Sequence, residues 1–163
     1  MLDASKSESS GELAILIIED MPADYLLIQR HLRKVGLLQR SSRVDTTEGL
    51  EAALAERWDV VLSDYNVPGM DVEASLQMIR ERCPDIPVIL VSGSIGEELA
   101  VELLHLGFHD FILKERLARL PSSIRRAVAE ARERRARYLA EHEVRKLALA
   151  VEQSPESIVI TDI

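Results

Sequence analysis

Polar side chains follow several of the apolar segments in this chain, and their types suit phosphoryl transfer. Glu19 and Asp20 follow LAILII, Asp64 follows VVLS, Ser92 closes IPVILVS, and Lys114 follows HDFIL. A carboxylate can attack an electrophilic phosphorus, and a lysine or a hydroxyl can bind the oxygens of the transferred group. We therefore predict that Asp64 is the nucleophile and that Lys114 and Ser92 contact the phosphoryl oxygens.

The carboxylates also predict a metal site. Glu19, Asp20 and Asp64 would repel one another at a shared rim unless a positive charge lay among them. A hard cation bound through oxygen atoms would supply that charge. Mg²⁺ commonly takes one or two carboxylates together with water or phosphate oxygens, so Mg²⁺ is the predicted cofactor.

Alternating apolar and helical patterns indicate how these residues are positioned. Short apolar segments that read as strands lie at 13–18, 41–45, 58–63, 86–92 and 109–114. Helical patterns separate them at 22–35, 47–56, 72–83 and 96–106. The alternation is typical of an α/β fold with a five-stranded parallel sheet, doubly wound by helices on both faces. The carboxyl ends of such strands meet at one rim, where ligands bind.

Local signals mark the ends of two of these helices. Gly36 and Gly107 stand where the first and the fourth helix should stop, because glycine accepts a positive φ. The pattern Ser94-x-x-Glu97 is that of a capping box, which predicts that Ser94 caps the start of the fourth helix.

The composition indicates a cytoplasmic globular protein. With 163 residues, 47% of them hydrophobic, the chain can form one domain and an appendage. No apolar run approaches the roughly 20 residues of a membrane helix, and the first ten residues carry no secretion signal, so we expect no membrane contact. The net charge of −8 argues against direct binding of nucleic acid by the domain.

Residues 121–152 predict one long helix. They hold 8 Lys and Arg against 5 Asp and Glu and would span roughly 48 Å. Their apolar residues form an imperfect heptad stripe, made of Ile124, Val128, Ala131, Tyr138, Val144, Leu147 and Val151. The stripe favours a homodimeric coiled coil over a helix that packs back on the domain.

In type and order, these motifs resemble the receiver domain of two-component response regulators. The resemblance covers residues 12–120 and implies a flavodoxin-like (βα)5 fold. It also implies roles for the matching positions: Glu19 and Asp20 as the acidic metal pair, Asp64 as phosphoacceptor, Asn66 as a metal ligand through its backbone carbonyl, Ser92 as switch hydroxyl, Phe111 as switch aromatic, and Lys114 as the invariant lysine. The implied phosphoryl donor is a phosphohistidine on a cognate histidine kinase or histidine phosphotransfer protein.

Two positions depart from the pattern of that family. Glu115 follows Lys114, where the family usually has a proline after a cis peptide bond. A non-proline cis bond costs about 3–4 kcal/mol, so we expect a trans bond here. Glu19 replaces the commoner aspartate, and its longer side chain predicts an indirect contact with the metal.

The end of the chain resembles a second family. LALAVEQSPESIVITDI is similar to the entry helix and first strand of a sensory-box (PAS) domain. The expected organisation is a disordered N-terminus at 1–11, a receiver domain at 12–120, a signalling helix at 121–152 and the start of a truncated PAS-like domain at 153–163. The parent chain implied by the two resemblances is a sensor histidine kinase or a cyclic-dinucleotide enzyme.

We therefore predict a phosphoacceptor module that relays phosphorylation of Asp64 through the long helix to a sensory or output domain. The alternative is a receiver-like module that dimerises and is never phosphorylated. Glu19 and the missing proline favour the alternative, whereas Asp64, Ser92 and Lys114 oppose it. A stand-alone phosphatase ranks last, because Asn66 cannot serve as its acid–base residue.

Overall fold

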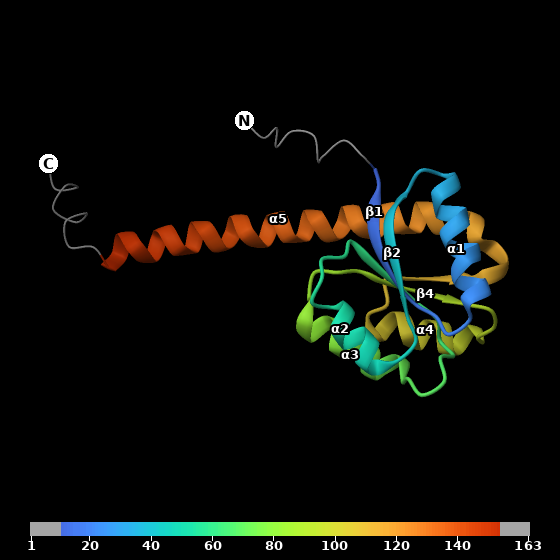
Figure 1. The fold of residues 1–163 in the computed structure, drawn as a ribbon. Coiled ribbons are helices and arrows are strands. Elements are labelled where there is room, and N and C mark those ends of the chain that lie inside the picture. Colours follow the sequence, from blue (N-terminus) through green and yellow to red (C-terminus); the bar gives the residue numbers. More distant parts are fainter. Residues whose placement is uncertain (1–10, 154–163) are drawn as a thin grey trace, which may run out of the picture.

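The computed structural model of the protein describes residues 11–153. The predicted disordered segment at 1–11 and the predicted PAS-like start at 153–163 therefore lie outside the described residues, apart from Gly11 and Gln153. Figure 1 shows a domain built on one sheet, from which a long helix extends.

Strands and helices alternate along the chain. The strands are β1 (Leu13–Ile18), β2 (Leu38–Val44), β3 (Val60–Ser63), β4 (Val88–Ser92) and β5 (Asp110–Leu113). The helices are α1 (Pro22–Lys34), α2 (Thr47–Ala53), α3 (Val72–Arg82), α4 (Glu97–Leu106), the short 3₁₀ helix η2 (Lys114–Arg119) and α5 (Leu120–Gln153). All five predicted strands are present, and β2 starts earlier than predicted. Because β2 lies at the sheet edge, its sequence LQRSSRV is more polar than a central strand and gives a weak strand signal.

The sheet is parallel throughout, with strand order β2-β1-β3-β4-β5. The chain moves from β1 outward to β2 and then returns to the other side of β1, so the strand order reverses between β1 and β3. In such sheets the crevice at this reversal is the usual ligand site. Ile18 pairs with Ser63 in register, which places the next residues, Glu19 and Asp64, at the same rim.

Two hydrophobic cores cover the two faces of the sheet. Along β1, Ile15 and Ile17 face the core shared with α1 and α5, whereas Leu16 and Ile18 face the core shared with α2, α3 and α4. This alternation follows from the two-residue period of a strand. The doubly wound α/β fold is confirmed, and Figure 1 shows the helices on both sides of the sheet.

The helix ends confirm one local prediction and contradict another. Gly36 and Gly107 have φ values of 72° and 120°, as expected for glycines that end helices. The capping-box prediction is wrong, because Gly96 is the N-cap of α4 and no side chain caps it. Glu97 is the first residue of the helix, whereas a capping box requires it to be the third.

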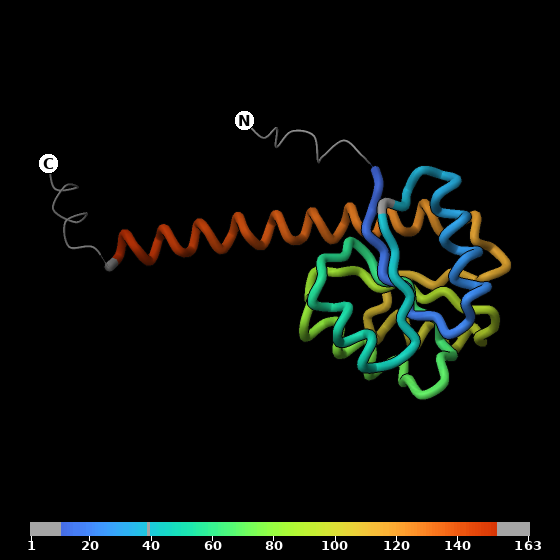
Figure 2. The backbone as a smooth tube through the Cα atoms, viewed as in Figure 1, coloured from blue at the N-terminus to red at the C-terminus, as the bar shows by residue number. Residues whose placement is uncertain are grey.

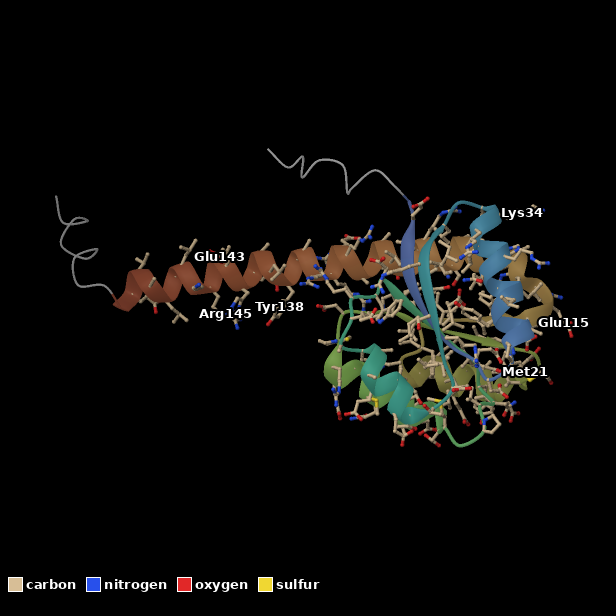
Figure 3. The ribbon with its side chains drawn as sticks, viewed as in Figure 1. Met21, Lys34, Glu115, Tyr138, Glu143 and Arg145 are labelled. Atoms are coloured by element: carbon tan, nitrogen blue, oxygen red, sulfur yellow. The ribbon has the colours of Figure 1, made fainter. Side chains whose placement is uncertain are left out.

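The first part of the long helix α5 packs back on the domain, which is the arrangement that the sequence analysis did not favour, whereas pairing of two copies through the helix stays a prediction. Leu120, Ile124, Ala127 and Val128 are buried in the core on its face of the sheet. Ala131 is the last buried residue, and the side chains at 132–152 are exposed. Figure 2 shows the helix leaving the domain, and Figure 3 shows the side chains of Tyr138, Glu143 and Arg145 on its projecting part.

Polar contacts fasten the first part of α5 to the domain. Ser123 and Arg126 both donate to the carboxylate of Asp110 on β5, at 2.6 and 2.9 Å. Arg132 reaches Asp59, which directly precedes the central strand β3, at 3.5 Å. Within residues 11–153, no helix is both long enough and apolar enough to cross a membrane.

Candidate functional site

Neighbouring strand ends position the two central carboxylates. The backbone N–H of Asp64 donates to Ile18 at 2.9 Å, and that of Glu19 donates to Val44 at 3.0 Å. These bonds continue the sheet ladder one residue past the strands, so both residues leave the sheet in a defined direction. Glu19 is 1% exposed and Asp64 is 9% exposed, which makes them two of the few buried acids in the domain.

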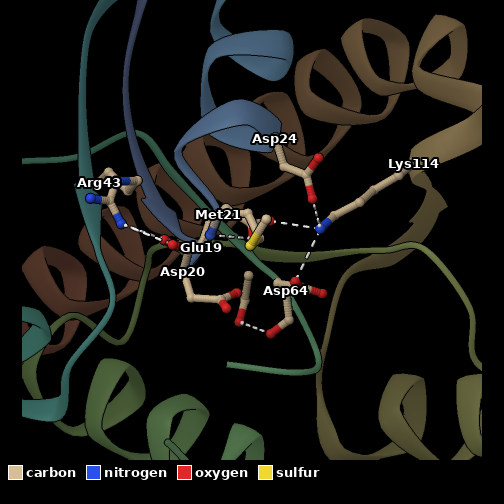
Figure 4. A network of polar contacts seen from close by, with 8 residues as sticks. Glu19, Asp20, Met21, Asp24, Arg43, Asp64 and Lys114 are labelled. Atoms are coloured by element: carbon tan, nitrogen blue, oxygen red, sulfur yellow. Dashed lines mark hydrogen bonds and ion pairs between the residues drawn. The ribbon is translucent and has the colours of Figure 1, made fainter. Parts of the chain in front are cut away.

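Lys114 lies among three carboxylates, as Figure 4 shows. Its Nζ is 2.8 Å from Glu19 Oε2, 2.8 Å from Asp24 Oδ2 and 3.0 Å from Asp64 Oδ2. The sequence analysis assigned the neutralising charge of this rim to a metal ion. The structure shows that the protein supplies one positive charge of its own, because β5 ends directly before Lys114.

Burial and pairing change the proton affinities of these groups. Burial raises the pKa of Glu19 above its usual value, against the lowering effect of its hydrogen bonds from Lys114 and the backbone of Met21. Burial by itself would lower the pKa of Lys114, but its hydrogen bonds to Asp24, Glu19 and Asp64 raise that pKa above the ordinary value. Lys114 is therefore a permanent cation, suited to bind an anionic group.

The same acids fit a divalent cation. One carboxylate oxygen from each of Glu19, Asp20 and Asp64 lies within 4.8 Å of the other two. Two oxygens bound to one Mg²⁺ at about 2.1 Å lie at most about 4.2 Å apart, so a small side-chain adjustment lets these oxygens share an ion. The donor set consists of hard oxygens, which Mg²⁺ prefers.

The remaining predicted residues lie around this cluster without joining its hydrogen bonds. Ser92 is the last residue of β4, 1% exposed, and its register partner Leu113 directly precedes Lys114. Phe111 on β5 is partly buried against the α2–α4 core. Asn66 is exposed in the loop after β3.

Asp24 is the partner of Lys114 that the sequence analysis missed. It lies in the first turn of α1, 90 residues before Lys114 in the chain. A carboxylate in a first turn normally reads as a favourable charge near the helix N-terminus, so its sequence position carries no signal for a contact with Lys114.

The loop after Lys114 follows the sequence prediction. No cis peptide bond occurs within the described residues, so the Lys114–Glu115 bond is trans. Glu115 is the second residue of η2, which begins at Lys114, and its side chain is exposed.

The fold and this site define a class of protein. A doubly wound parallel sheet carries an acidic cluster and a lysine at the carboxyl ends of β1, β3 and β5. Comparison with family models matches residues 15–125 to the response regulator receiver domain. The chain therefore belongs to the receiver domain family of two-component response regulators. Domains of this family generally bind Mg²⁺ at an acidic pocket, which agrees with the donor set described above.

Relatives and solved structures agree with this assignment. The chain is 33% identical over 142 residues to the C4-dicarboxylate transport transcriptional regulatory protein DctD of Pseudomonas aeruginosa, covering 86% of this chain but only 29% of that relative. A receiver domain of a signal transduction histidine kinase from Syntrophus aciditrophicus is 27% identical, with a TM-score of 0.62 over 72% of this chain and 91% of that one. The CheY-like receiver domain protein of Methanospirillum hungatei shares the fold, with 23% identity and a TM-score of 0.65 over 74% of this chain and 97% of that one.

Proposed function

We propose that this chain is a phosphoacceptor module in which Asp64 takes a phosphoryl group from a phosphohistidine. The observation that carries the proposal is the position of Asp64. Its carboxylate is buried, lies 3.0 Å from Lys114 Nζ and is grouped with the carboxylate oxygens of Glu19 and Asp20. A carboxylate oxygen of Asp64 forms the new bond to phosphorus, and the phosphorus–nitrogen bond of the phosphohistidine breaks. The imidazole leaves with the electron pair of that bond.

Each neighbouring residue has a role in this proposal. Asp20, Asp64 and the backbone carbonyl of Asn66 would hold Mg²⁺, with Glu19 contacting it indirectly, and the ion would supply charge neutralisation for the phosphoryl oxygens when bound. Lys114 binds a phosphoryl oxygen through its ammonium group. Its positive charge is already in place at the site before the reaction.

The remaining predicted residues transmit the change. The hydroxyl of Ser92 would donate to a phosphoryl oxygen present only after phosphorylation, so that contact favours one of two conformations. Phe111, three residues before Lys114, would repack at the same time. The surface of α4 and β5 and the start of α5 then change together, and α5 carries the change to a sensory or output domain.

The partners proposed for the module are a histidine kinase or histidine phosphotransfer protein and a second copy of the chain. The chain spans less than a third of the length of the relative from Pseudomonas aeruginosa. The identity of the parent protein is therefore a further part of the proposal. We propose a sensor histidine kinase as parent, which is supported by similarity to a receiver domain of such a kinase. The proposed location is the cytoplasm, with no contact between this module and nucleic acid.

The test is phosphorylation by acetyl phosphate in Mg²⁺, measured by intact mass. Wild type should gain one labile phosphoryl group, and Asp64→Asn should gain none. Asp85→Asn is the matched control, because Asp85 is exposed and lies before the amino end of β4, whereas the site lies at the carboxyl ends of the strands, so this change should leave labelling unchanged. A folded wild-type protein that takes up neither phosphate nor beryllofluoride would favour the unphosphorylated dimerisation module instead.

A further inference from the structure

Asp24 contacts Lys114 directly, and its position in the first turn of α1 does not explain this contact. We propose that Asp24 is a positioning residue, which holds the Lys114 ammonium in place while the phosphoryl group binds. The inference rests on the proposed function and extends it to a residue outside the predicted site.

The donor count of Lys114 leads to this inference. A lysine ammonium has three N–H donors. The three carboxylates at 2.8, 2.8 and 3.0 Å, from Glu19, Asp24 and Asp64, accept all of them. A phosphoryl oxygen can therefore bind Lys114 only by replacing one of these acceptors.

The three carboxylates differ in whether a metal ion or the phosphoryl group would compete with Lys114 for their oxygens. Glu19 and Asp64 belong to the oxygen cluster that fits a divalent cation, and Asp64 is also the proposed site of phosphorylation. Asp24 is not part of that cluster. When the cation and the phosphoryl group occupy the oxygens of Glu19 and Asp64, Asp24 is the acceptor that still holds Lys114.

The helix that carries Asp24 is well anchored. The next residue, Tyr25, contacts the β2 residue Ser41 through the two hydroxyl groups at 2.7 Å. The backbone N–H of Tyr25 donates to Met21 at 3.1 Å, which closes the first turn of α1. Asp24 is 38% exposed on its side chain, whereas Lys114 is 18% exposed, so the contact lies at the mouth of the site. A carboxylate on such an element can restrict the rotamers of a long, flexible lysine side chain.

The charge change alone predicts the opposite effect. Replacing Asp24 by asparagine removes a negative charge from the site and should therefore strengthen the binding of an anion. If Asp24 positions Lys114, the same change should weaken it. The sign of the effect thus separates positioning from simple electrostatics.

The experiment compares Asp24→Asn with wild type at saturating Mg²⁺. Two quantities are measured, the rate of labelling by acetyl phosphate and the affinity for beryllofluoride by calorimetry. Both should fall roughly tenfold, the size of effect seen when residues that orient metal ligands are replaced. Glu73→Gln is the matched control, because Glu73 is exposed in the first turn of α3 and loses the same charge there. It should stay within about twofold of wild type.

A double-mutant comparison tests whether Asp24 acts through Lys114. In a Lys114→Ala background, Asp24→Asn should lower the beryllofluoride affinity no further. Equal effects in both backgrounds, or wild-type behaviour of Asp24→Asn, would overturn the inference. Thermal unfolding of each variant shows that the comparison is made on folded protein. If wild type is labelled and Asp24→Asn is labelled equally well, only the inference on Asp24 is rejected. If wild type is not labelled at all, the proposed function is rejected as well.

Discussion

Lys114 stabilises the buried carboxylates around it, in addition to its role in the proposed reaction. Glu19 is buried, and Lys114 is one of two groups that donate to its carboxylate, the other being the backbone N–H of Met21 at 3.1 Å. Removing one partner of a buried ion pair strongly destabilises the folded protein, because the other charge stays buried without compensation.

We expect Lys114→Met to lower the free energy of unfolding by about 3 kcal/mol in the absence of Mg²⁺, because three carboxylates then face one another. Added Mg²⁺ should restore part of this loss, since the cation binds only the folded site. Urea unfolding with and without Mg²⁺ measures both effects. Lys34→Met, in the exposed last turn of α1, is the control and should change stability by less than about 1 kcal/mol. Equal stability of Lys114→Met and wild type without Mg²⁺ would contradict the argument.

The helices differ in how their ends are satisfied. Thr46 accepts from Gly49 at the start of α2, and Asp71 accepts from Ala74 at the start of α3. At its start, α4 has no such side-chain cap, and it ends on Gly107, whose φ is 120°. The Gly107 N–H donates to Leu103 and Leu104, so the backbone conformation of this glycine closes the helix.

We expect Gly107→Ala to destabilise the domain by about 1–2 kcal/mol, because a side chain at this positive φ is strained. The new methyl group would also require the Arg80 side chain to move. Thermal unfolding should show a lower Tm by several degrees. Gly93→Ala is the control, because its φ lies outside the positive range and nothing lies within 4 Å of the added carbon. A Tm for Gly107→Ala equal to that of the control would refute the strain argument.

In the protein as a whole, the apolar residues in the projecting part of α5 lie on the opposite side of the helix from those that pack against the sheet. At about 100° per residue, the twenty positions between Ile124 and Val144 correspond to a rotation of about 200°. Ile124 lies in the core against the sheet, whereas Val144 is exposed. The exposed residues Val144, Leu147 and Val151 therefore lie on the side of the helix opposite to the domain. In the proposed dimer, pairing through these residues would place each domain on the outer side of its helix.

We expect Leu147→Glu to shift the protein toward monomer, because a charge would be buried in the proposed coiled-coil seam. Sedimentation velocity measures the change. Leu149→Glu is the matched control, since Leu149 is 50% exposed and Leu147 is 59% exposed, and the two lie about 200° apart around the helix. Equal effects of both substitutions, or a wild-type protein that is monomeric at high concentration, would exclude pairing through this face.

Much of the fold and the centre of the site follow from local patterns. The strands that flank the site are apolar over their length and end in polar residues, and a parallel sheet brings its carboxyl ends to one rim for geometric reasons. The approach of Glu19 and Asp64 could therefore be predicted before any contact was known. The start of α4 could not be predicted in this way, because Ser94 matches a cap by spacing, whereas Gly96 is the N-cap in the structure.

Contacts between remote segments depended on the tertiary structure. Asp24 and Lys114 are 90 residues apart, and their contact requires α1 to lie against the end of β5. The point after Ala131 where α5 stops packing is likewise set by the size of the sheet beneath it. The sequence does not indicate this point, because the helical pattern continues unchanged through it. Local propensity depends on the neighbours of a residue along the chain. The ion-pair partners of a charged side chain depend instead on which elements pack together in the folded protein.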